Sequence, residues 1–306
     1  MPRPAPHRAQ ERDTRIDSLR GIAIVLMIAG HVIGGMHVAA SSGWTFSYAL
    51  FADLRMPLFT ALSGFVYGPR PVSSLPAYGP FVWKKTRRLL VPLVTVGSLF
   101  IVLQSLVPGT NSDVALSEIW RLYVFGMGHF WFLQAIFLIF LVVGLADAAG
   151  WLQFRGAGPW LLAFAALAAV CIRVPLQWDI FSVSRAIYLL PFFMAGYLLS
   201  QGALDRAASV KKLMPCVALI LLTVRGNVVS GLIVLPQAVD SALGVTLGLT
   251  GVASLILWRD YIRWKPLAWL GVFSFGIYLF HIFGSASARM LLAGLGVEKV
   301  KSRLVV

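Results

Sequence analysis

Long apolar stretches follow one another along most of the 306 residues, with only short polar breaks between them. A run of about 17 to 25 apolar residues is long enough for an α-helix to cross a bilayer. Of all residues, 58% are hydrophobic and 12% are charged, whereas about 25% are charged in soluble domains. The sequence therefore predicts an all-α, polytopic transmembrane helix bundle of about nine to ten spans.

The apolar runs divide the chain into predicted spans and connections. The spans are predicted at residues 19–38, 47–68, 89–107, 130–147, 159–175, 181–200, 213–225, 241–258 and 266–288. The segment 227–240 holds Pro236 and Asp240 and is predicted to be a loop or a re-entrant piece. We expect a polar N-terminal segment at 1–15, one transmembrane domain at 16–288 and a short basic tail at 289–306, with no tenth span after the ninth.

The distribution of basic residues predicts the orientation of the bundle. The formal net charge is +14, and Lys and Arg concentrate in the N-terminal segment and in every second loop. The alternate loops hold only Arg121, Arg173 and Arg225. Because cytoplasmic loops carry the excess of Lys and Arg, the N-terminus is predicted to be cytoplasmic. The charge thus reports membrane topology and does not indicate nucleic-acid binding.

The first apolar run, 20-RGIAIVLMIAGHVIGG-35, carries an arginine and a histidine. His31 lies eleven positions after Arg20, which in an α-helix places the two on the same face and about 16 Å apart along the axis. Asp17 lies three residues before Arg20 and is placed to hold its guanidinium. An ionisable group inside a membrane is energetically costly and is therefore a candidate functional residue. A surface cation for a phosphate and a deeper proton acceptor would suit an extended, phosphorylated donor.

The stretch 84-KKTRRLLVP-92 places four cations at the entry to the third predicted span. Lys84 with Arg87, and Lys85 with Arg88, are i,i+3 pairs that could grip phosphates. Anchoring at the cytoplasmic interface is an equally good interpretation.

Two further predicted spans contain charges. Asp53 and Arg55 lie in the second, and Arg185 lies in the sixth. Charges at this depth must face the bundle interior or a wet cavity. Arg185 could pair with Asp53 or with an anionic ligand.

The remaining candidate residues are aromatic or imidazole groups. His129 and Trp131, in 128-GHFWFLQAIF-137, lie at the outer end of the fourth predicted span, where aromatics form an interface belt or could stack on a sugar. His281 is a second intramembrane imidazole, for which a packing hydrogen bond is the alternative. Cys171 and Cys216 are predicted to pack within apolar runs and to form neither a disulfide nor a metal site.

Five stretches together resemble the integral-membrane acyltransferase family 3, the glycan O-acyltransferases of bacteria. They are RIDSLRGIAIVLMIAGHV, LRMPLFTALSGFVYG, WKKTRRLLVPLV, GHFWFLQAIFLIFLV and LGVFSFGIYLFHIF, in the order of the family. The family pattern of a basic residue, ten residues and a histidine matches Arg20 and His31. Its basic pair separated by two residues matches Lys85 with Arg88, or Lys84 with Arg87.

The resemblance implies a membrane O-acyltransferase, usually an O-acetyltransferase, in the cell inner membrane. An acyl group, commonly acetyl from cytoplasmic acetyl-CoA, would reach a hydroxyl of a surface polysaccharide, lipopolysaccharide, peptidoglycan or glycosylated metabolite. The acyl-CoA is then a co-substrate, and no tightly bound cofactor is expected. His31 would act as general base or carry the acyl group.

Two other classes of function remain open from the sequence. One is a proton-coupled transporter with a relay through His31, Asp53, Arg185 and His281. The other is an inactive relative that lacks the last span of the family. The cation cluster on the line from Arg20 to His31 favours the acyltransferase, since a relay does not need it.

Overall fold

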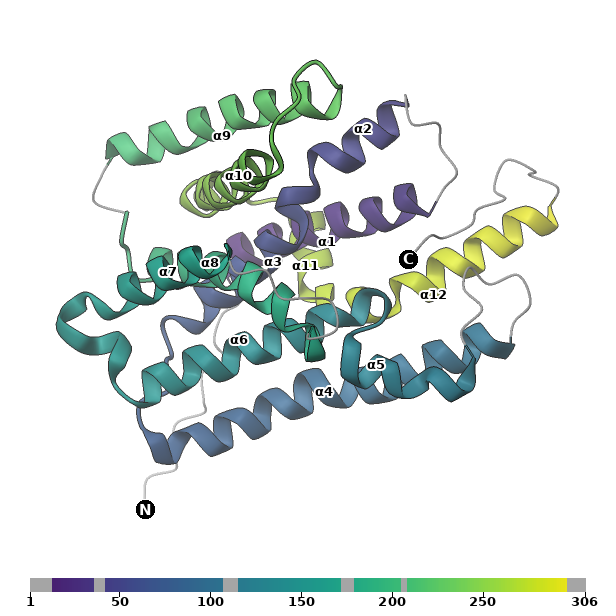
Figure 1. The fold of residues 1–306 in the computed structure, drawn as a ribbon, viewed down its shortest axis with the longest axis horizontal. Helices are drawn as coiled ribbons and strands as arrows, with labels where there is room; N and C mark the ends of the chain where they lie inside the picture. The colour runs from purple at the N-terminus through teal and green to yellow at the C-terminus, as the bar shows by residue number, and fades with distance from the viewer. Residues whose placement is uncertain (1–12, 36–41, 107–114, 172–178, 205–207, 296–306) are drawn as a thin grey trace.

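The structure, a computed structural model, describes residues 13–35, 42–106, 115–171, 179–204 and 208–295. Every regular element within these ranges is a helix, as the sequence predicts. The longer helices are α1 (Thr14–Gly34), α2 (Gly43–Leu50), α3 (Ala52–Tyr67), α4 (Leu75–Leu106), α5 (Ile119–Phe125), α6 (Trp131–Ala148), α7 (Gly158–Ala169), α8 (Val183–Ser200), α9 (Ala208–Val229), α10 (Gln237–Leu257), α11 (Lys265–Val272) and α12 (Ser274–Gly294). They form a bundle with α4 along one edge and α9 along the opposite edge (Figure 1).

The predicted count of nine to ten membrane crossings is not confirmed by the described helices. Seven described helical stretches are long and apolar enough to span, or eight if the bent pair of α11 and α12 is one span. Each of the nine predicted runs falls on a helix, but α7 has only 12 residues and is shorter than a crossing requires. The predicted loop at 227–240 is helical at both ends, and residues 230–236 separate α9 from α10.

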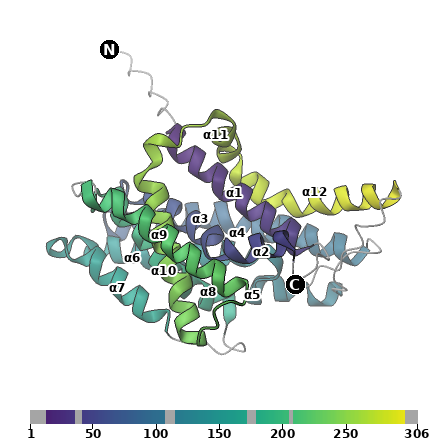
Figure 2. The same ribbon diagram turned by 90° about the horizontal axis from the view of Figure 1, so that it is seen from above.

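Two predicted continuous spans are broken helices. The run 47–68 forms α2 and α3, which are separated by Phe51 in a non-helical conformation. The run 266–288 forms α11 and α12, whose axes differ by 82°; Figure 2 shows α12 leaving α11 toward the edge of the molecule. Hydropathy reports only the composition of a run and therefore could not predict the interruption at Phe51 or the bend before α12.

Helices α3 and α8 meet backbone to backbone through two glycines. A Cβ atom on Gly64 would lie 2.0 Å from the carbonyl oxygen of Phe193, and one on Gly196 would lie 1.9 Å from that of Ala61. Small residues allow such close approach between membrane helices. The aromatic side chains of Phe192 and Phe193 on α8 are fully buried beside this contact.

Helices α1 and α11 make a second contact of the same kind. A Cβ atom on Gly21 would lie 2.0 Å from the carbonyl oxygen of Leu267, and one on Gly271 would lie 1.8 Å from that of Asp17. This contact fixes the start of α1 against the short helix that precedes α12. It thereby sets the position of the two helices that carry His31 and His281.

A cluster of charges holds the N-terminal end of α1 to the turn after α10. Arg15 Nε lies 2.8 Å from Asp13 and its Nη1 lies 2.7 Å from Asp260, in the turn Arg259–Tyr261. The Arg15 hydrogen bond lowers the pKa of Asp13 and also that of Asp260 below the ordinary carboxyl value.

We expect this cluster to lose its small contribution to stability in acid. A carboxyl whose pKa is lowered in the folded state stabilises the fold above its unfolded pKa, and the contribution disappears as the pH falls through the folded pKa. Because the pairs are solvent-exposed, Asp260→Asn should lower the melting temperature at pH 7 by less than about 2 °C. Thermal unfolding of both proteins should show this difference shrinking below about pH 4. An equal difference in acid and at neutral pH would contradict the assignment.

Candidate active site

The predicted pair at the start of α1 is present. Arg20 Nη1 lies 3.1 Å from Asp17 Oδ1, and the carboxylate is buried while the guanidinium remains partly exposed. Because α1 is continuous from Thr14 to Gly34, His31 lies about 16 Å further along the same helix. Asp17 therefore orients Arg20 and lies about 21 Å along the axis from the level of His31.

Three histidines from distant parts of the sequence converge around the end of α1. The ring centroid of His31 lies 4.9 Å from that of His281 on α12 and 6.4 Å from that of His129, in the turn before α6. The rings of His129 and His281 are also 4.9 Å apart. We call His31, His129 and His281 the histidine cluster. The sequence identified each member, but only the fold shows that they share one site.

Tyr278 connects two members of the histidine cluster. Its hydroxyl donates to the carbonyl oxygen of His129, and its own carbonyl oxygen lies 2.7 Å from Nδ1 of His281. Since a carbonyl can only accept, Nδ1 of His281 carries a proton and Nε2 is left as an acceptor. Nε2 of His281 and both ring nitrogens of His129 are buried and without a hydrogen-bond partner among the described residues. Buried, unpartnered polar atoms of this kind require an explanation, and a substrate is one.

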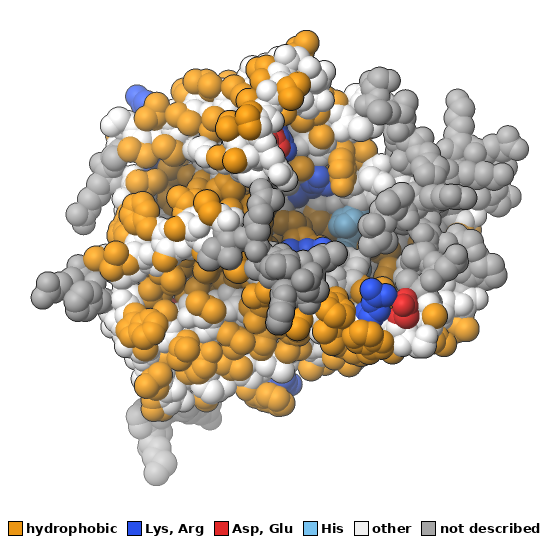
Figure 3. All heavy atoms as spheres, viewed as in Figure 1, with side chains coloured by type: hydrophobic (Ala, Val, Ile, Leu, Met, Phe, Trp, Pro, Cys, Tyr) orange, Lys and Arg blue, Asp and Glu red, His pale blue; other side chains and the backbone are white. Residues whose placement is uncertain are grey.

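A hollow opens near the middle of one face of the molecule (Figure 3). Lys or Arg side chains and a histidine line it, and apolar side chains surround it. That histidine belongs to the histidine cluster, because the cluster contains all three histidines in the described ranges. At least part of the cluster is therefore accessible from outside the bundle.

The two possible basic pairs on α4 point in different directions. Lys85 is partly buried, with Nζ 3.3 Å from the centroid of the Phe140 ring, and Arg88 lies 5.8 Å from the ring of Phe275 at the start of α12. Lys84, Arg87 and Arg88 are exposed. Lys85 and Arg88 are nevertheless the pair that lies near aromatic rings of α6 and α12, which favours that register over the other.

The charges of the second and sixth predicted spans pair differently from the expectation. Asp53 Oδ2 lies 3.0 Å from Nε of Arg225 on α9, and Arg225 also forms an ion pair with Asp240 on α10. Arg185 is exposed and lies 4.8 Å over the ring of Trp131. The predicted pairing of Arg185 with Asp53 is therefore wrong, and so is the placement of Arg225 in a loop, because α9 continues to Val229.

Other sequence-based assignments change as well. His129 was predicted beside Trp131 at an outer interface, yet its side chain is only 3% exposed and faces the histidine cluster. A residue of an interface belt would instead face lipid and water. Cys171 and Cys216 are free and exposed and do not pack inside the bundle. Among the described residues, no group of three His, Cys, Asp or Glu side chains is placed to hold a metal ion.

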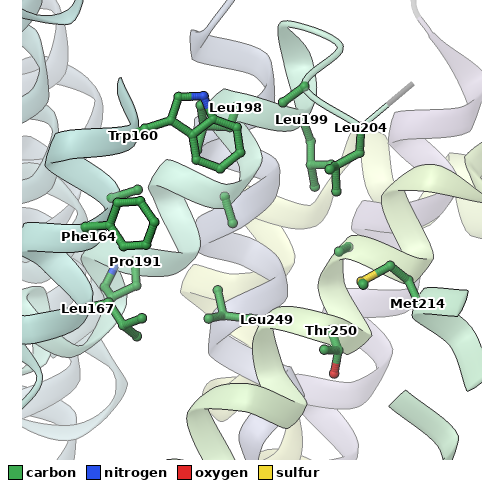
Figure 4. A pocket seen from close by; sticks show the side chains of 14 residues that line it. Trp160, Phe164, Leu167, Pro191, Leu198, Leu199, Leu204, Met214, Leu249 and Thr250 are labelled. Atoms are coloured by element: carbon green, nitrogen blue, oxygen red, sulfur yellow. The ribbon is translucent and has the colours of Figure 1, made fainter. Parts of the chain in front are cut away.

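A separate cavity of about 250 Å³ lies between α7, α8, α9 and α10. Figure 4 shows its lining of apolar side chains, such as Trp160, Phe164 and Met214. The hydroxyl of Thr250 on its wall is bonded to the carbonyl oxygen of Thr246 at 2.8 Å. The cavity offers no acid or base, so the histidine cluster remains the candidate active site.

Fold and site together define a class: a helical protein of apolar, membrane-length helices that gathers imidazoles and cations inside its bundle. The family model of the acyltransferase domain of family 3 matches residues 13–299. The chain belongs to this acyltransferase family, as the five sequence stretches indicate.

Two curated proteins are similar in sequence to a shorter part of this chain. The chain is 26% identical over 204 residues to the nodulation protein NolL of Sinorhizobium fredii, which covers 65% of this chain and 52% of that protein. It is 24% identical over 199 residues to NolL of Mesorhizobium japonicum, with coverages of 64% and 50%. The chain thus matches about half the length of these relatives. No solved structure matches it.

Three residues were not assigned a role from the sequence. Tyr278 gives no sequence signal apart from its place three residues before His281. Arg225, which pairs with Asp53, was interpreted as a loop residue that reports membrane topology. Arg55 was recognisable only as a charge within a span, and its contact with α1 at Gly30 is a long-range contact that the sequence does not show.

Proposed function

We propose that the protein is a membrane O-acyltransferase that moves an acyl group from cytoplasmic acyl-CoA to a hydroxyl of a carbohydrate at or beyond the membrane. The proposal places the N-terminus in the cytoplasm and the bundle in the cell inner membrane. The observation that carries it is α1, which presents the Arg20–Asp17 pair at its first turns and His31, within the histidine cluster, about 16 Å further on. Membership of the acyltransferase family supports the same chemistry.

The donor would lie along α1. Arg20 and the pair of Lys85 and Arg88 supply cations for the phosphates of CoA, because charge-assisted hydrogen bonds suit phosphate oxygens. An extended pantetheine arm is long enough to bring the thioester to His31. The hollow of Figure 3 then provides a route for a sugar hydroxyl.

The chemical step requires one base. The acceptor oxygen attacks the thioester carbonyl carbon, and His31 takes the hydroxyl proton. The carbon–sulfur bond then breaks, and the CoA thiolate leaves with the proton from the imidazolium. In the second possible route the His31 ring first carries the acyl group and then passes it to the hydroxyl.

The direct test is acyl transfer by the purified protein in nanodiscs. We expect release of CoA from radiolabelled acetyl-CoA to accelerate when a hydroxyl-bearing glycan is added, with label recovered on the glycan. Empty nanodiscs provide the background. No transfer to any member of a panel of polysaccharide, lipopolysaccharide, peptidoglycan and glycosylated small molecules, together with no binding of acyl-CoA, would refute the proposal.

The two basic pairs of α4 provide a sharper test of donor binding. Lys85→Ala and Arg88→Ala should each raise KM for acyl-CoA about tenfold, because a hydrogen bond to a charged group is worth about 1.5–3 kcal/mol. The pair Lys84 and Arg87 is the matched control: Lys84→Ala and Arg87→Ala should change KM by less than about threefold. Equal effects of the two pairs, in proteins of equal thermal stability, would show that the register of Lys85 and Arg88 does not bind the donor.

A further inference from the structure

Helix α1 carries one glycine before and one after His31, in the stretch 30-GHVIG-34. In membrane helices such spacing usually admits the backbone of a neighbouring helix. Here it admits side chains. A Cβ atom on Gly30 would lie 1.9 Å from Nη1 of Arg55, and one on Gly34 would lie 3.2 Å from the ring of Tyr48. The guanidinium of Arg55 is therefore seated against the backbone of α1 at the residue next to His31.

Both side chains come from the second predicted span. Tyr48 lies on α2 and Arg55 on α3, and Phe51 between the two helices departs from helical geometry. The Nη2 atom of Arg55 donates to the carbonyl oxygen of Tyr48 at 2.9 Å, and the guanidinium lies 4.2 Å from the centroid of the Tyr48 ring. These contacts hold the guanidinium in place against α1, at the residue next to His31.

The charge of Arg55 has no carboxylate partner among the described residues. Asp53, two positions earlier, is engaged by Arg225 on another helix. An arginine has five N–H donors, and the described residues accept from Arg55 only at Nη2. A cation within the bundle that is fixed by neutral groups, and left with free donors, is arranged to receive an anion.

We propose that Arg55 is a catalytic residue that donates from its free N–H groups to the acyl carbonyl oxygen and stabilises the oxyanion of the tetrahedral intermediate. This inference rests on the proposed acyl transfer. When the acceptor oxygen adds to the thioester carbon, the carbon–oxygen double bond opens and its electron pair becomes the oxyanion. His31 takes the proton of the acceptor hydroxyl. The oxyanion then collapses, the carbon–sulfur bond breaks, and CoA leaves as the thiol with that proton.

Steady-state kinetics of Arg55→Gln separates this role from binding. Loss of one donor to an oxyanion lowers kcat by about 10²–10³-fold, and KM for acyl-CoA and for the acceptor should change by less than about threefold, because the ground-state carbonyl is not charged. A kcat within about threefold of wild type would overturn the proposal. So would an unchanged kcat with a raised KM for an anionic acceptor, since Arg55 would then bind that substrate.

Chemical rescue distinguishes the loss of the Arg55 charge from a structural effect of the substitution. Arg55→Ala leaves space beside Gly30. Millimolar guanidinium should raise the kcat of Arg55→Ala at least about tenfold, whereas urea, which has a similar shape and no charge, should leave it unchanged. Equal responses to guanidinium and urea would contradict a charge-based role.

A glycine substitution tests the seat of the guanidinium without altering Arg55 itself. Gly30→Ala should displace the guanidinium and lower kcat as Arg55→Gln does. Gly79→Ala on α4, where an added Cβ meets no atom within 4 Å, should behave as wild type. A fully active Gly30→Ala enzyme would overturn the proposal. If the wild type transfers the acyl group and the Arg55 variants do so equally well, only this inference is rejected. If the wild type transfers no acyl group, both the proposed function and this inference are rejected.

Discussion

His31→Ala should lower the rate of acyl transfer by about 10²–10⁴-fold, the range in which a positioned general base or acid contributes to catalysis. The imidazole lies within 4.9 Å of the His281 ring centroid, and no other described side chain of α1 beyond Arg20 can exchange a proton. The affinity for acyl-CoA should remain within about threefold of wild type, because the cations proposed to bind the phosphates lie about 16 Å away along α1. Initial rates of label transfer and equilibrium binding of acetyl-CoA measure the two quantities.

The adjacent residue provides the control for this experiment. Val32 lies on the exposed side of α1, so Val32→Ala should retain activity within about threefold of wild type. A His31→Ala protein that is folded, binds acyl-CoA and still transfers the acyl group at the wild-type rate would remove His31 from the mechanism. Rapid quenching of the wild type distinguishes the two chemical routes, because only an acyl carrier would retain label on the protein.

Gly196→Ala should strongly destabilise the bundle although the substitution is conservative. The added methyl group would lie 1.9 Å from the carbonyl oxygen of Ala61, and only a shift of the backbones of α3 and α8 can relieve that overlap. Overpacking of this kind costs about 1–3 kcal/mol and sometimes more. We expect a fall in melting temperature of about 5 °C or more, measured by thermal unfolding in detergent.

The same substitution at a position with free space separates overpacking from a general effect of alanine. Gly276→Ala on α12 adds a Cβ atom with no neighbour within 4 Å, and alanine is the better helix former. Its melting temperature should equal or exceed that of wild type. If Gly196→Ala were as stable as Gly276→Ala, the backbone contact between α3 and α8 would not stabilise the bundle.

Hydropathy predicted where helices occur but not how they are directed. Within the described residues, each of the nine predicted runs contains a helix, because apolar composition and helix formation coincide in a membrane protein. The start of α4 at Leu75, well before the predicted residue 89, was missed because Lys84 to Arg88 read as a polar break. Lys and Arg are good helix formers whose long side chains reach polar surroundings, so they interrupt an apolar run without ending a helix.

The site was predictable as a set of residue types and not as an arrangement. The spacing of Asp17, Arg20 and His31 follows from helix geometry, and the Arg20–Asp17 pair is present at 3.1 Å. The convergence of His129 and His281 on His31 depends on the 82° bend before α12 and on the turn before α6. Such long-range contacts leave no periodicity in a single sequence. The partner of Asp53 could not be chosen for the same reason.

The central claim, that the donor lies along α1 with its thioester at the histidine cluster, is tested most directly by a cryo-EM structure with a non-hydrolysable acyl-CoA analogue bound. We predict phosphates beside Arg20 and the pair of Lys85 and Arg88. The atom that replaces the thioester carbonyl carbon should lie about 3–4 Å from the His31 ring, with the carbonyl oxygen facing Arg55. Phosphates bound at the opposite end of α1, or an acyl group remote from His31, would contradict the account.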